Sequence, residues 1–140
     1  MEGRLYVFTA LQIVIMLALF WFLITWSGPW NWGRYLGTVS VVVGAGFIVV
    51  ARFQLGKSFS LAPKAKKLVT AGLYSKIRNP IYVFGSLLFA GFILIVQRPI
   101  LWILLSVLVI AQSIRAHREA RVLEDAFGDE YREYRRKTWF

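Results

Sequence analysis

The sequence contains no cysteine and a single histidine, His117, among 140 residues. Without thiols the chain can form no disulfide bond, no thiolate nucleophile and no cysteine-ligated metal centre. One imidazole is also too few for a histidine-rich metal site. We therefore expect no metal cofactor, and any chemistry must use carboxylates, hydroxyls, amides and cationic side chains.

Acidic residues are scarce as well. Seven Asp and Glu stand against 17 Lys and Arg, which gives a formal net charge of +10. In a soluble chain this excess would suggest a nucleic-acid partner. Here the basic residues flank long apolar runs, so we expect membrane lipids with anionic headgroups as the counter-charge, and no nucleic acid.

Apolar residues dominate the rest of the chain, at 58% of all positions, which is too many for one soluble domain. They form four runs, over residues 5–26, 35–53, 81–96 and 100–114. A helix needs about 20 residues to cross the hydrocarbon core. The first two runs are long enough, and snorkelling of Arg98 and Arg115 extends the last two. Because lipid tolerates no unpaired backbone, we expect four transmembrane helices.

The expected fold is therefore an all-α integral membrane protein with a single membrane domain over residues 1–140. We expect helices over about 5–26, 35–53, 81–96 and 100–126, a connector over 54–80 and a tail over 127–140. The first run has a longer apolar core than a signal peptide and no small-residue cleavage site after it, so we expect it to persist as a helix. In the second run, Ser40 and Gly44 share one face and predict close helix packing.

Positive charge predicts the orientation. With four spans, the N-terminus, the connector and the tail share one side, which carries nearly all Lys and Arg. The opposite side carries only Arg34 and Arg98. The positive-inside rule then predicts a multi-pass protein with both termini in the cytoplasm.

The stretch just before the third apolar run is the most distinctive in the chain. Gly72 allows a turn without a Cβ penalty. Pro80 suits the first turn of a helix and pushes Asn79 towards an extended conformation. The stretch is thus predicted to be a shaped loop that delivers Arg78, Asn79 and Tyr82 to the mouth of a membrane helix. The alternative is an ordinary juxtamembrane connector, with Arg78 on lipid phosphates and Tyr82 among the interfacial aromatics.

The fourth run continues without a break into charged sequence, so we expect a cytoplasmic extension to about residue 126, a turn at Gly128 and a second short helix. Spacing on the extension predicts ion pairs of Arg115 with Glu119 and of Arg121 with Glu124 or Asp125. Arg115 and Glu119 lie where the helix leaves the bilayer, on a face that can look back to the Tyr82 loop. The alternative is a plain solvated helix.

Two spaced motifs resemble one family of enzymes. The first motif is Leu68-Val69-Thr70-x-Gly72-x-Tyr74-x-x-x-Arg78-Asn79-Pro80-x-Tyr82. The second is Glu119-x-x-x-Leu123-x-x-x-Phe127-Gly128-x-x-Tyr131-x-x-Tyr134. Together, over about residues 53–138, they resemble the isoprenylcysteine carboxyl methyltransferases and the related phospholipid methyltransferases, which are integral membrane enzymes.

This resemblance implies S-adenosylmethionine as cofactor, held on the cytoplasmic side between the connector and the C-terminal helices. The implied cofactor-binding residues are Lys67, Leu68, Val69, Tyr74, Arg78, Asn79, Pro80, Ile81, Tyr82 and Glu119. Glu119 would accept from the amino group of the methionine moiety, and Arg115 would bind an anionic group of the substrate. Arg115, Glu119 and Tyr82 are the implied catalytic residues.

The expected activity is transfer of a methyl group to a lipophilic acceptor, either an isoprenylcysteine-type carboxylate or a phospholipid-type amine. A carboxylate needs no general base, whereas an amine must lose a proton, for which Glu119 or Tyr82 are the candidates. Two alternatives remain open. One is an NADPH-dependent membrane reductase of the steroid or sterol type, and the other is a non-catalytic four-helix lipid-binding protein.

Overall fold

The computed structural model describes residues 2–56 and 68–140, and over these ranges the chain is helical, as predicted. Its elements are α1 (Glu2–Thr25), α2 (Trp32–Leu55), the 3-10 helix η2 (Gly72–Ser75), α3 (Pro80–Val96), α4 (Leu101–Phe127) and α5 (Asp129–Lys137). Helices α1 to α4 cover the four apolar runs. Helix α2 begins earlier than the run suggests, because Asn31 caps it by accepting from the Arg34 N–H at 3.0 Å.

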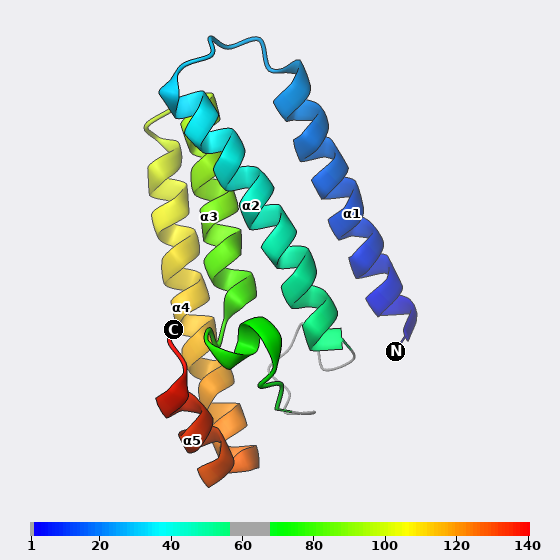
Figure 1. Ribbon diagram of the computed structural model, residues 1–140, viewed down its shortest axis with the longest axis vertical. Helices are drawn as coiled ribbons and strands as arrows, with labels where there is room; N and C mark the ends of the chain where they lie inside the picture. Colours follow the sequence, from blue (N-terminus) through cyan, green and yellow to red (C-terminus); the bar gives the residue numbers. More distant parts are fainter. Residues whose placement is uncertain (1, 57–67) are drawn as a thin grey trace.

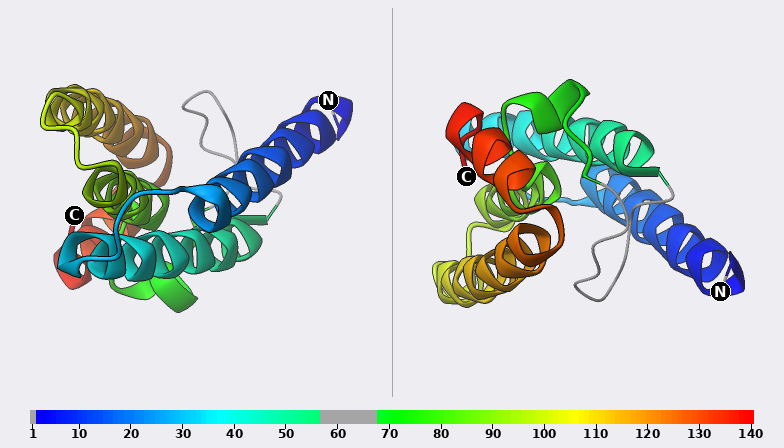
Figure 2. Two further views of the ribbon diagram at one scale, coloured as in Figure 1. Left: turned by 90° about the horizontal axis from the view of Figure 1, so that it is seen from above. Right: turned by 90° about the horizontal axis from the view of Figure 1, so that it is seen from below.

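The long helices lie side by side, with α4 continuing past the start of α3 and α5 folding back beside it (Figure 1). Views along the bundle place α3 between α2 and α4, while α1 diverges from the other helices (Figure 2). Helix α1 contacts α3 through Phe22 and Phe92, whose ring centroids are 5.1 Å apart. Helix α3 is therefore the central element. Its two neighbours define two different interfaces.

Helices α2 and α3 pack with their backbones in contact. A Cβ atom built on Gly37 would lie 2.5 Å from the Gly91 carbonyl oxygen, and one built on Gly91 would lie 2.6 Å from that of Gly37. A Cβ on Gly44 would lie 2.9 Å from the Phe84 carbonyl, and Ser40 also contacts Gly91. The small residues thus allow the close approach predicted for Ser40 and Gly44.

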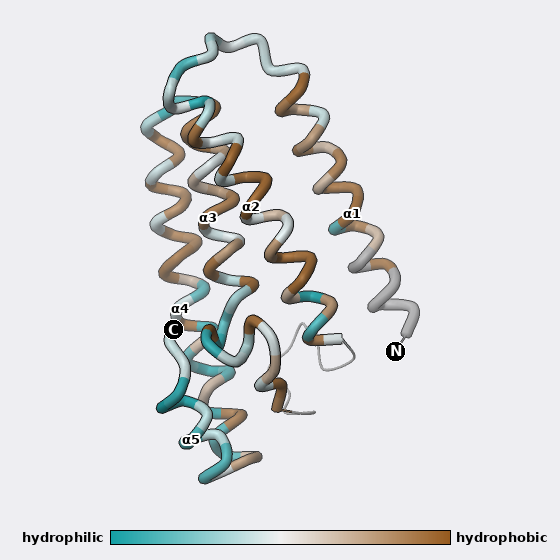
Figure 3. Tube along the Cα trace, viewed as in Figure 1, coloured by the Kyte–Doolittle hydropathy of each residue, from teal (hydrophilic) through white to brown (hydrophobic). Residues whose placement is uncertain are grey.

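Two helices of the described chain, α2 and α4, are long and apolar enough to cross a bilayer by length and composition, while α3 and the segment Ala10–Thr25 of α1 are shorter. Only 6% of the most apolar stretch of α4 is buried inside the chain. Apolar residues extend along α2, α3, most of α4 and the coloured part of α1, and polar ones gather on α5 and the adjoining end of α4 (Figure 3). Such exposed apolar surface is unfavourable in water and favourable in lipid.

The end of the bundle remote from α5 is closed by Arg34, which is 4% exposed. Its guanidinium donates to the Gly28 carbonyl and, at 2.6 Å, to that of Trp26, and it lies 4.0 Å from the Trp30 ring centroid. These contacts hold the α1–α2 loop. Arg34 is therefore a structural residue at the end opposite the charged helices.

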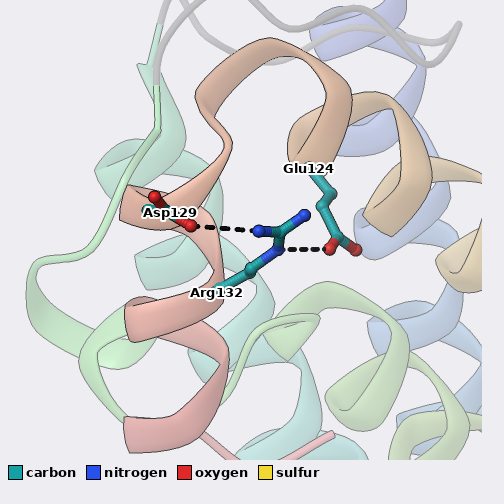
Figure 4. A network of polar contacts seen from close by, with 3 residues as sticks. All are labelled: Glu124, Asp129 and Arg132. Carbon is teal, nitrogen blue, oxygen red and sulfur yellow. Dashed lines mark hydrogen bonds and ion pairs between the residues drawn. The ribbon is translucent and has the colours of Figure 1, made fainter.

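The turn between α4 and α5 occurs at Gly128, as predicted, with φ +53°. It brings Arg132 between two acids: its guanidinium donates to Glu124 at 2.8 Å and to Asp129 at 3.0 Å (Figure 4). The predicted pairing of Glu124 with Arg121 is therefore wrong. The chain reversal, which local spacing on one helix does not include, supplies Glu124 with a partner from α5.

Candidate functional site

Three side chains meet across α3 and α4, where α3 begins. The Tyr82 hydroxyl donates to Glu119 Oε1 at 2.8 Å, and Arg115 Nε donates to the same oxygen at 2.9 Å. The Arg115 guanidinium lies 5.9 Å from the Tyr82 ring centroid. The structure thus brings together the three residues implied to be catalytic, although their roles in catalysis stay predictions.

The ion pair in this cluster is accessible. The Arg115 and Glu119 side chains are 43% and 26% exposed, respectively. Partly exposed ion pairs contribute little to stability, about 0–1 kcal/mol, so the pair is not what holds the helices together. Both bonds end on Oε1 of Glu119, and Oε2 takes part in neither. The carboxylate therefore keeps an oxygen with which to accept from a ligand.

Local backbone chemistry positions Tyr82. Pro80 is buried at the first turn of α3, as predicted. Asn79 has φ −124° and ψ 58°, so its backbone is not fully extended as predicted. The reason is that its carbonyl accepts from the N–H groups of Tyr82 at 3.0 Å and Val83 at 3.1 Å. Asn79 therefore starts the helix and fixes the direction in which Tyr82 leaves it.

The preceding turn is fastened to the end of α2. Gly72 has φ +63°, and a Cβ there would lie 2.4 Å from the Gln54 side chain. The Leu73 N–H donates to Gln54 Oε1 at 2.7 Å. The positive φ favours glycine at this position, and an added side chain would also have to displace the end of Gln54. The predicted turn is confirmed, and Gln54, which sequence reasoning missed, is the residue that holds it.

Tyr74 lies buried behind this turn. Burial raises the pKa of Tyr74 above its usual value, Tyr134 raises it further and Arg52 opposes the shift. Glu119 also raises the pKa of Tyr74, as Tyr134 does. Tyr74 and Tyr82 interact electrostatically as well. Tyr74 therefore remains a neutral phenol beside the cluster. Arg52 is a second residue that the sequence reading missed, and its one signal is its position as a cation in the last turn of an apolar helix.

The C-terminal residues pair with the loop that leads into α3. Trp139 N donates to Lys76 O at 2.7 Å, and Arg78 N donates to Phe140 O at 2.8 Å, so the tail runs parallel to the loop before α3. The Arg78 side chain donates to the Arg135 carbonyl at 3.3 Å. Arg78, an implied cofactor contact, therefore holds α5 in this structure and does not join the Tyr82 cluster.

The remaining implied cofactor contacts are distributed around this centre. Leu68 and Val69 are half-buried in the coil before η2, and Ile81 is half-buried in the first turn of α3. Lys67 lies outside the described residues. The structure thus brings Tyr74, Tyr82, Arg115 and Glu119 together, while Arg78 contacts α5 and the C-terminal residues instead.

These observations define a class of protein. It is a helical membrane protein with a polar site at one end of the apolar parts of α3 and α4. The family model for phospholipid methyltransferases matches residues 32–130, from α2 to the start of α5. The match covers well over half of the chain, so the chain belongs to the phospholipid methyltransferase family, as its motifs suggested. No curated protein and no solved structure matches it. Membership implies a methyltransferase, and together with the two candidate spans it indicates a membrane protein.

Proposed function

We propose that this chain transfers the methyl group of S-adenosylmethionine to a lipophilic acceptor at the cytoplasmic face of a membrane. The observation that carries the proposal is the contact of Tyr82, Glu119 and Arg115 across α3 and α4, inside the residues that the family model matches. The contact joins an acid, a neutral hydroxyl and a cation at one point. Those are the groups needed to hold a charged cofactor and an ionic acceptor together.

The proposed topology has four spans in a single membrane domain over residues 1–140, in which α1 and α3 cross the bilayer together with α2 and α4. Both termini then lie in the cytoplasm, on the side rich in Lys and Arg. In this arrangement the Tyr82 cluster, α5 and residues 68–80 all lie at the inner membrane face. There the partly exposed Arg115 and Glu119 side chains would meet both a soluble cofactor and a lipid from the bilayer.

The side chains present fit the proposed cofactor. S-adenosylmethionine carries an ammonium group, and the accessible Glu119 carboxylate suits it. The other proposed contacts are Lys67, Leu68, Val69, Tyr74, Asn79, Pro80, Ile81 and Tyr82. When bound, the cofactor supplies an electrophilic methyl group on a sulfonium, so the protein needs to provide neither a nucleophile of its own nor a metal.

Positioning is the main contribution that the protein then makes. Arg115 would bind the anionic group of the acceptor and align its nucleophilic atom, and such alignment is a large part of the catalysis of a transfer reaction. For a carboxylate acceptor no base is required. For an amine acceptor, Glu119 or Tyr82 would take the proton that the amine loses. The apolar side chains of α3 and α4 keep water from the membrane side of the site.

Membership in the family favours methyl transfer over an NADPH-dependent reductase or a non-catalytic lipid-binding protein. Calorimetry on the purified chain separates the three possibilities. Binding of S-adenosylmethionine and S-adenosylhomocysteine supports the proposal. Binding of NADPH in their place supports a reductase, and binding of none of these supports the non-catalytic protein.

The first prediction concerns Glu119. Glu119→Ala should weaken S-adenosylmethionine binding at least about tenfold, because a charge-assisted hydrogen bond contributes about 1.5–3 kcal/mol. Its melting temperature should stay near that of the parent protein, since the exposed ion pair adds little stability. The matched control is Glu133→Ala, which removes an exposed glutamate paired with Lys137 on α5. Equal affinity of Glu119→Ala and the parent protein would contradict the assignment.

A further inference from the structure

A second polar contact joins α3 and α4, deeper in the bundle than the Tyr82 cluster. The Ser86 hydroxyl donates to Gln112 Oε1 at 2.9 Å. Ser86 follows Tyr82 by four residues and Gln112 precedes Arg115 by three. With a rise of about 1.5 Å per residue, the pair lies about 5 Å further along the two helices, towards the membrane interior.

Ser86 differs from the other serines of the apolar helices. Ser40, Ser106 and Ser113 each donate to the carbonyl four residues earlier on their own helix, at 2.8, 2.9 and 2.8 Å, respectively. Ser86 donates across the interface instead. Its bond fixes the orientation of the Gln112 amide, with the oxygen engaged and the amino group turned away.

The amino group of Gln112 lies beside Gly85. A Cβ built on Gly85 would have Gln112 Nε2, at 3.8 Å, as its one neighbour within 4 Å among the described atoms. No hydrogen bond from this amino group is formed within the described part of the chain. Gly85, Ser86 and Gln112 are all half-buried, so a lipid can reach them. An unused N–H in an apolar setting is costly unless a ligand oxygen accepts from it.

We propose that the Gln112 amide, oriented by Ser86 beside Gly85, is a subsite for an acyl ester carbonyl of the methyl acceptor. This inference rests on the proposed function and assigns to Gln112 a contact with the acyl linkage of the acceptor. Along the interface, the acceptor's ionic headgroup would lie at Arg115 and Glu119. Just beneath a lipid headgroup the polar atoms are ester oxygens, which accept hydrogen bonds and carry no charge. A neutral amide donor suits an ester carbonyl oxygen. A lipid with ether-linked chains has no such carbonyl oxygen.

The test uses the full chain with two lipids of identical headgroup and chain length, diacyl phosphatidylethanolamine and its dialkyl ether analogue. The first readout is competitive retention of the two lipids by the purified protein, measured by native mass spectrometry. The parent protein should retain the ester lipid about threefold to tenfold better, the ratio expected for one hydrogen bond within a membrane. Gln112→Leu should abolish the preference and Ser86→Ala should reduce it. The matched control Gln12→Leu, which removes a glutamine of α1, should leave it unchanged.

The second readout is methyl transfer, where Gln112→Leu should raise KM for the ester lipid with little change in kcat, because it removes binding and not chemistry. Equal retention of both lipids by the parent protein would overturn the subsite. The subsite would also be overturned if Gln112→Leu lost retention of the ester and ether lipids equally and had a lower melting temperature. That result would mean that Gln112 stabilises the contact between α3 and α4 and does not bind the lipid. Absence of methyl transfer to any acceptor would instead overturn the proposed function, while the retention ratio would still decide the subsite.

Discussion

The two faces of α3 contact their neighbouring helices, α2 and α4, through different kinds of interaction. Towards α2, glycine backbones touch: Gly37 and Gly91 leave no space for a side chain between the helices. Towards α4, polar side chains meet at two depths, through Tyr82 with Glu119 and through Ser86 with Gln112. One face is therefore a steric contact between backbones, and the other is a set of hydrogen bonds between side chains.

This difference separates scaffold from site. A backbone contact cannot loosen without losing the packing of every atom in it, so α2 and α3 form a fixed pair. A side-chain hydrogen bond within a membrane contributes only about 0.6 kcal/mol on average, and a ligand can replace it. We therefore expect ligands to enter along α4 and leave the α2–α3 contact unchanged.

The largest effect is expected from a substitution at the α2–α3 contact. Gly91→Val places a branched side chain where even a Cβ would lie 2.6 Å from the Gly37 carbonyl, and overpacking of this kind costs about 1–3 kcal/mol. Thermal unfolding in detergent should show a clearly lower melting temperature. The control is Gly46→Val on α2, where nothing lies within 4 Å of an added Cβ. A melting temperature for Gly91→Val equal to that of the control would mean that the backbones do not need this contact.

The next largest effect concerns the polar contacts between α3 and α4 and leaves the α2–α3 contact unchanged. Arg115→Ala should lower kcat/KM for the methyl acceptor by about tenfold to a hundredfold, the range for a hydrogen bond to a charged group. It should leave the melting temperature and S-adenosylmethionine affinity nearly unchanged. Arg118→Ala, at an exposed arginine of the same helix, is the control. A variant that loses cofactor affinity more than acceptor use would show that Arg115 serves the cofactor.

The helices and the α2–α3 contact were easier to predict from sequence than the polar contacts between α3 and α4. Apolar run length locates the helices, and small residues such as Gly44 mark the packed face. Gly72 and Gly128 were recognisable as turns because a positive φ favours glycine. The approach of Tyr82 to Glu119 followed from both lying where an apolar helix meets the interface.

The other partners across helices were not readable. A helix in lipid is apolar all round, so periodicity does not tell which face meets a neighbour. Nothing local to Ser86 distinguishes it from Ser106, although only the first bonds across helices. Pairing of Arg132 with Glu124 and of the tail with Lys76 depends on the chain reversal at Gly128, and the sequence gives no measure of the angle of that turn.

The smallest expected effect sharpens the comparison at the edge of the site. The Tyr134 hydroxyl donates to the Tyr74 carbonyl at 2.7 Å and so fastens α5 to the loop before α3. Tyr134→Phe should cost about 1 kcal/mol. Hydrogen exchange should become faster in residues 76–79 and 138–140 and stay unchanged between α2 and α3. Tyr35→Phe, at an exposed tyrosine of α2, is the control.

The same bond predicts a dependence on alkaline pH. Burial, followed by the neighbouring Tyr131, raises the pKa of Tyr134 to about 12, against about 10 for an unfolded tyrosine. Below about pH 10 both states keep the proton and the bond contributes fully; between about pH 10 and 12 the unfolded state ionises first, so stability falls. Tyr134→Phe should therefore lose less stability than the parent between about pH 10 and 12, with a residual loss from Tyr74. Identical alkaline losses in both proteins would mean that α5 is held by the backbone pairing of the tail and not by this phenol.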